Sequence, residues 1–135
     1  MDRHRRRLVL ASCVCVLGFV LHNGDHARRG LAGTPDGVVW AGSVLLAVGA
    51  AVVTLVATGH RHAPLAAAGF GFGTAIGVTA SHLLPHWSAL SDPLADAGVG
   101  AVTWLAVSAE IAGSLVLGLV GASIVLRRPS RPALG

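Results

Sequence analysis

The chain has few charged residues, and it draws them from a narrow set. Only 12% of its 135 residues are charged, whereas 53% are apolar, and a typical soluble domain is about 25% charged. Lysine is absent, glutamate occurs once, at position 110, and methionine occurs only at position 1. The shortage of charge excludes a soluble domain. The lone methionine argues against copper(I) traffic, which favours thioether ligands.

Positive charge is present, but its distribution argues against a nucleic-acid partner. All ten basic residues are arginines, and the formal net charge is +4. They flank apolar segments and form no separate basic face, so we interpret them as membrane-topology signals.

The two cysteines do not predict a disulfide or a redox motif. Cys13 and Cys15 lie two residues apart in an apolar run, and residues at this spacing on a helix do not face each other. We interpret both as small residues of the protein interior.

Four apolar segments are long enough to cross a membrane, because about 30 Å of hydrocarbon requires about 20 helical residues. They cover residues 8–26, 36–58, 64–87 and 99–126. The first contains an apolar run that also suits a signal peptide, but no small-residue cleavage site follows it, so we expect an uncleaved helix. Residues 1–135 are therefore predicted to form one all-α domain, an integral membrane four-helix bundle.

The arginines predict the orientation of this bundle. Eight of them lie before the first segment, between the second and third, or after the fourth, whereas only Arg28 and Arg29 lie on the opposite side. The positive-inside rule then places both termini in the cytoplasm of a multi-pass protein of the cell membrane.

Glycines of the third segment predict close helix packing in the bilayer. Gly69, Gly73 and Gly77 recur every four residues, and such small-residue spacing lets another helix approach. The chain could therefore form a homo-oligomer through these glycine-rich faces.

Ionisable residues of three segments are predicted to lie at one depth. At a rise of 1.5 Å per residue, His22 lies about 22 Å, His82 about 27 Å and Glu110 about 25 Å from the cytoplasmic edges of their segments. His26 and His86 lie about one turn further out. His26 follows His22 by four residues, and His86 follows His82 by four residues. The two histidines of each pair should therefore share a helix face.

This His/Glu cluster in the outer leaflet predicts a metal site. An unpaired charge inside a bilayer is unfavourable by roughly 2.5 kcal/mol or more, so a buried ionisable group is by default functional. Nitrogen and oxygen donors suit a divalent metal, with zinc or iron favoured. The predicted ligands are His22, His26, His82, His86 and Glu110.

Several residues in and near the cluster receive further predicted roles. Glu110 could act as a general base as well as a ligand, and Asp25, three residues after His22, could support a ligand or take part in catalysis. Arg28 and Arg29 could clamp the phosphate of a lipid headgroup, although a solvated pair is the simpler interpretation. Asp92 could overhang the site, and Thr34 is a predicted N-cap of the second helix.

Several functions agree with this pattern. A metal-dependent enzyme acting on a lipid-like substrate or a quinone is the leading hypothesis, because the site would open at the lipid–water boundary. The sequence does not decide whether the protein is an enzyme. The alternatives are a haem-binding electron carrier with His22 and His82 as axial ligands, a small ion- or proton-coupled transporter, and an accessory membrane subunit.

Overall fold

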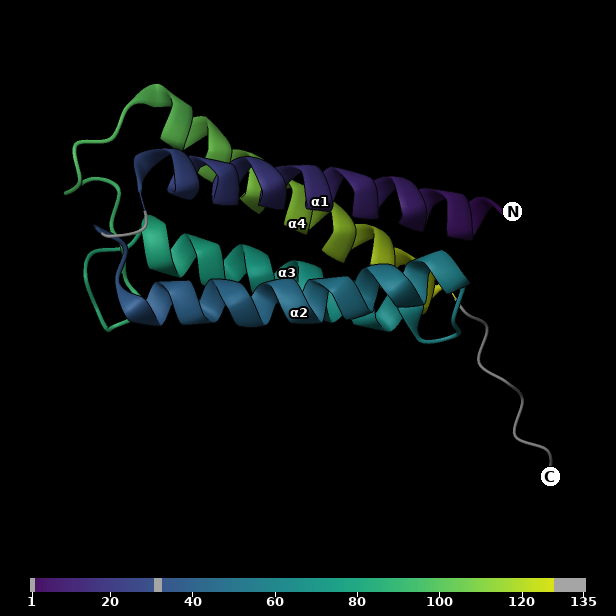
Figure 1. The fold of residues 1–135 in the computed structure, drawn as a ribbon. Helices are drawn as coiled ribbons and strands as arrows, with labels where there is room; N and C mark the ends of the chain where they lie inside the picture. The colour runs from purple at the N-terminus through teal and green to yellow at the C-terminus, as the bar shows by residue number, and fades with distance from the viewer. Residues whose placement is uncertain (1, 31–32, 128–135) are drawn as a thin grey trace.

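A computed structural model describes residues 2–30 and 33–127 and contains four helices in these ranges. They are α1 (Arg3–Arg29), α2 (Asp36–Thr58), α3 (Ala63–His82) and α4 (Ala101–Leu126). All four are long and apolar enough to cross a membrane, so the predicted all-α membrane bundle is confirmed. The helices run alternately in opposite directions, and the N-terminus lies at the same end as the last turns of α4 (Figure 1). The cytoplasmic location of that end stays a prediction, and Arg128 and Arg131 lie outside the described residues.

Two helix boundaries differ from the prediction by five residues each, for local reasons. Helix α1 begins at Arg3, because the carboxylate of Asp2 accepts a hydrogen bond from the Arg5 main-chain N–H at 2.8 Å and caps the helix. Helix α3 ends at His82 rather than near residue 87. The residue before a proline disfavours helical geometry, and Pro85 follows this end closely.

Helix α4 packs along both α1 and α3, and glycines allow the backbones to come close. A Cβ atom added to Gly18 of α1 would lie 2.8 Å from the Glu110 Cα of α4, and one added to Gly71 of α3 would lie 2.8 Å from the Gly118 Cα. Real Cβ atoms do not approach so closely. These helix pairs therefore depend on residues without a side chain.

Helix α2 lies at the periphery of the bundle. Only Val52 and Val56 of its residues are buried, and it packs mainly against α3, as Figure 1 shows. The hydroxyls of Ser43, Thr54 and Thr58 donate to carbonyl oxygens of their own helix. Because it directs no polar group into the bundle, α2 contributes apolar surface only.

The outward surface of the bundle is apolar, as a bilayer requires. Ile76 is 69% exposed, Leu105 is 70% exposed and Trp40 is 68% exposed. Gly69, Gly73 and Gly77 also lie on the outward side of α3, with open space beyond each. The glycine of α3 that packs within the chain is Gly71, and a homo-oligomer through the other three stays a prediction.

The two kinds of α3 glycine give a stability test. We expect Gly71→Ala to destabilise the protein by about 1–3 kcal/mol, because the new methyl group overpacks the contact with α4. Gly69→Ala is the matched control and should be neutral or slightly stabilising, because its Cβ would enter open space. Thermal unfolding of both variants in detergent measures the difference. Equal stability of the two variants would contradict the packing described for α3 and α4.

Candidate metal centre

Three buried histidines meet near the ends of two helices that run in the same direction. His22 and His26 belong to the last turns of α1, and His82 is the last residue of α3. The ring centroid of His22 lies 4.8 Å from those of both His26 and His82, and the centroids of His26 and His82 are 5.6 Å apart. One nitrogen from each ring lies within 4.8 Å of the other two. These residues form the histidine cluster.

Helix α4 contributes Glu110, which bonds to one ring of the histidine cluster. The Nδ1–H of His22 donates to the Glu110 carboxylate, and the two side chains are only 6% and 2% exposed. The other nitrogen of His22, Nε2, is buried without a hydrogen-bond partner among the described groups. With the proton on Nδ1, the lone pair of Nε2 is available to a ligand.

The loop after α3 fixes the ring of His82 in a similar way. The Nδ1 of His82 lies 3.0 Å from the main-chain oxygen of Asp92. A carbonyl oxygen can only accept, so Nδ1 carries the proton and Nε2 carries the lone pair. The loop is held in place by Leu94, which is 1% exposed and donates its main-chain N–H to the His82 carbonyl oxygen at 3.0 Å.

The third ring, that of His26, has two different neighbours. Its Nδ1 lies 3.4 Å from the Thr34 hydroxyl and 3.3 Å from Nη2 of Arg29. The hydroxyl can accept a hydrogen bond from Nδ1–H, whereas the guanidinium can only donate one. The Nε2 of His26 can therefore act as a ligand when Nδ1–H donates to Thr34. Thr34 was predicted to cap α2, but the N-cap residue is Pro35, with no side-chain cap.

Asp25 pairs with the two arginines that follow it on α1. Its carboxylate accepts from Nη2 of Arg28 at 2.7 Å and from Nε of Arg29 at 3.0 Å. The Asp25 side chain is 2% exposed, whereas that of Arg28 is 58% exposed. A buried carboxylate thus offsets part of the positive charge that was predicted to clamp a headgroup. The clamp stays a prediction, and Asp25 is not one of the residues able to share an ion with the histidines.

His86 does not join the histidine cluster. It lies beyond the end of α3 and is exposed, so the expected helix face shared by His82 and His86 does not form. Asp92 was considered as a residue that could overhang the site, and the atom that reaches His82 at hydrogen-bond distance is its main-chain oxygen. The Asp92 carboxylate is 3.7 Å away from the same nitrogen. Because every residue has a main-chain carbonyl group, a contact of this kind cannot be predicted from the residue type.

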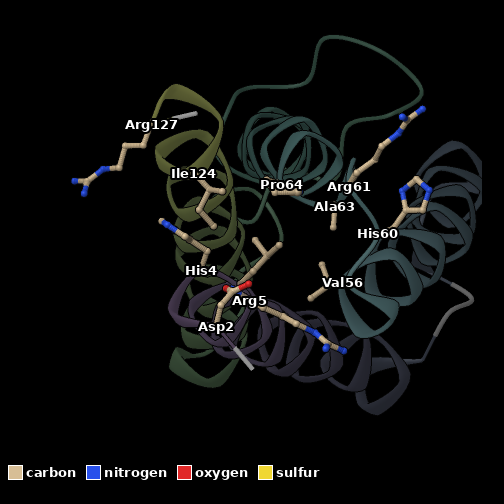
Figure 2. A pocket seen from close by; sticks show the side chains of 12 residues that line it. Asp2, His4, Arg5, Val56, His60, Arg61, Ala63, Pro64, Ile124 and Arg127 are labelled. Carbon is tan, nitrogen blue, oxygen red and sulfur yellow. The ribbon is translucent and has the colours of Figure 1, made fainter. Parts of the chain in front are cut away.

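A cavity of about 340 Å³ lies at the far end of the bundle from the histidine cluster. It is lined by the first residues of α1 and α3, the ends of α2 and α4, and the basic residues Arg5, His60, Arg61 and Arg127. Figure 2 shows the side chains of Arg61 and Arg127 extending away from the cavity. Because these charges do not converge on a common point, we do not treat this cavity as part of the site.

Comparison with known proteins adds no functional information. The chain matches no protein-family model, no curated protein and no solved structure.

The ion pairs of Asp25 give a second stability test. We expect Asp25→Ala to lower the free energy of unfolding by about 2 kcal/mol, because charged hydrogen bonds are lost from a buried group and Arg29 loses its ion-pair partner. Asp96→Ala is the matched control, since Asp96 is exposed, and should be close to neutral. Thermal unfolding in detergent measures both. A loss in the control as large as that in Asp25→Ala would refute a structural role for these pairs.

Proposed function

We propose that this membrane protein binds one divalent metal ion through His22, His26 and His82, and that zinc is the preferred ion. The observation that carries the proposal is the convergence of three buried imidazoles from two helices, with candidate ligand nitrogens within 4.8 Å of one another. Clusters of neutral imidazoles are the commonest protein ligands for such ions. Buried polar groups are normally hydrogen-bonded. The unpaired Nε2 of His22 therefore favours a ligand over purely structural contacts.

The partners of the outer nitrogens support the proposal. Metal-bound histidines usually donate their second N–H to a carboxylate or a main-chain carbonyl, which fixes the tautomer and the ring orientation. His22 donates to Glu110, and His82 donates to the Asp92 carbonyl. In this proposal Glu110 orients His22 and raises its basicity, and it is not itself a ligand.

The number of ligands bears on the kind of site. Three histidines leave one position of a tetrahedral zinc ion for water or substrate, as in catalytic rather than structural zinc sites. The three histidines would hold the ion, which when bound would supply an activated water for attack on a substrate. Hydrolysis of a lipid-like substrate at the membrane boundary is therefore the activity that we propose for this site.

A single ion fits the histidine cluster better than haem does. The rings of His22 and His82 are in edge contact, with centroids 4.8 Å apart. Two axial ligands must lie on opposite faces of a macrocycle, and this contact leaves no room for one between them. We therefore favour an ion over the haem considered from sequence.

Metal content tests the proposal directly. We expect about one zinc ion per chain after purification in detergent with zinc present, measured by elemental analysis, and loss of at least 100-fold in affinity in His82→Ala, because two imidazoles bind weakly. His86→Ala is the matched control and should retain wild-type content, since His86 is exposed outside the cluster. Equal metal content in the two variants would disprove the assignment of ligands.

The orienting role of Glu110 makes a separate prediction. We expect Glu110→Gln to keep one metal site per chain but to weaken zinc affinity by about 10–100-fold, because removing such a partner from a ligand typically has this effect. Competition with a chelator of known affinity measures the change, with Asp96→Asn as control. An unchanged affinity would show that Glu110 does not act through His22, and complete loss of the site would instead indicate a ligand.

A further inference from the structure

A second cavity, of about 260 Å³, lies in the apolar part of the bundle, and all four helices contribute to its lining. Its floor includes the buried residues Val52 of α2 and Leu117 of α4. At its rim, Val20 of α1 and Leu46 of α2 are each 58% exposed. Helices α1 and α2 make little direct contact with each other. The cavity is therefore a recess that opens between these two helices toward the surrounding bilayer.

The surface of this cavity is almost wholly apolar. Side chains such as Phe19, Leu45 and Phe70 form its wall, and the polar residues of the lining expose almost none of their polar atoms to it. A ligand with polar groups would lose its hydrogen bonds here without replacing them, which is unfavourable. An anion is further disfavoured, because Glu110 is part of the lining and the described lining includes no arginine or histidine. The surface therefore favours a hydrocarbon.

The cavity is long in the direction of the helices. Its lining extends from Ser12 to Val20 on α1 and from Leu45 to Val53 on α2, and each range covers about 12 Å at a rise of 1.5 Å per residue. These ranges lie in the middle of their helices, at the depth of the hydrocarbon core. At about 30 Å³ for a group the size of a water molecule, the cavity has room for roughly eight or nine methylene groups. A long, narrow recess of this volume suits one extended chain better than a compact ring.

We propose that this cavity binds one acyl chain of a membrane lipid. A chain in the recess contacts all four helices, whereas a lipid elsewhere on the bundle contacts only an outer face. Hydrocarbon gains no hydrophobic energy by moving from lipid to protein. The preference for the cavity therefore comes from dispersion contacts with its buried floor.

One end of the cavity lies beside the histidine cluster. Val20 is two residues before His22, and Glu110 both lines the cavity and bonds to His22. An acyl lipid also agrees with the hydrolysis of a lipid-like substrate that we propose for the cluster. Its binding in the cavity does not rest on that function, because the described lining contains no histidine.

Photolabelling in a bilayer tests the site. The full chain is placed in phosphatidylcholine nanodiscs with a small share of the same lipid carrying a diazirine in the middle of one chain, and labelled residues are mapped by mass spectrometry. We expect Val16 and Leu46 of the lining to be labelled about tenfold more than Leu115 and Val116, because contacts with the floor favour occupancy of the cavity. The two control residues lie in the middle of α4, are each 41% exposed and are not part of the lining. Equal labelling of all four residues would overturn the proposal.

Variants that fill the cavity test its role. Ala50 lines the cavity, so we expect Ala50→Phe to occupy it and to lower the labelling of Val16 and Leu46 about tenfold, to that of Val116. Ala47→Phe is the matched control, because Ala47 is also exposed on α2 but lies outside the lining. It should leave the wild-type pattern. Val16→Phe fills the cavity from α1 and should lower the labelling of Leu46 equally, so the test does not depend on the folding of one variant. Wild-type labelling in a filled variant would refute the assignment.

Zinc measurements on the same samples separate this inference from the proposed function. Ala50→Phe should keep wild-type zinc content, and wild type stripped with a chelator should keep its labelling pattern. Selective labelling of the cavity in a protein without any zinc site would sink only the proposed function. A zinc site in a protein whose lipid-facing residues are all labelled equally would sink only the inference about the cavity.

Discussion

The bond between Glu110 and His22 is the interaction on which the arrangement of this bundle depends. A carboxylate within an apolar helix must find a partner, because an unpaired charge in hydrocarbon is strongly unfavourable. Glu110 finds its partner in α1 and is almost fully buried. Gly18 makes this possible, since a side chain there would meet the α4 backbone at Glu110. The close approach of the two backbones and the Glu110–His22 bond therefore depend on each other. Together they fix which faces of α1 and α4 lie in contact.

Polar contacts and small residues also distinguish helices α1, α3 and α4 from helix α2. Lipid supplies no hydrophobic force between helices, so packing of small residues and polar contacts decides which helices associate closely. Helices α1, α3 and α4 bury polar residues among them: Ser114, for example, lies 3.7 Å from the Cys15 sulfur. Helix α2 has no inward polar group and packs more loosely. The cavity beside Ser12 and Thr74 lies where this loosely packed helix faces the others.

The sequence predicts the helices and much of the histidine cluster, for physical reasons that can be named. Apolar length gives the four spans, and helical spacing with a constant rise brings His22, His82 and Glu110 to one level. Contacts made by the main chain cannot be predicted in this way, as the Asp92 carbonyl on His82 shows. The sequence also does not reveal that Gly69 faces outward, because a repeat of small residues has the same pattern whether it packs within the chain or faces the bilayer.

The early end of α3 changes the chemistry expected of the site. A helix continuing past Pro85 would have placed His86 one turn beyond His82, and four histidines could close the coordination of a zinc ion. Instead the chain leaves the helix at His82, and the loop returns so that Asp92 orients the last histidine. At the metal site that we propose, three oriented histidines would leave one coordination position open, as in exchangeable rather than purely structural sites.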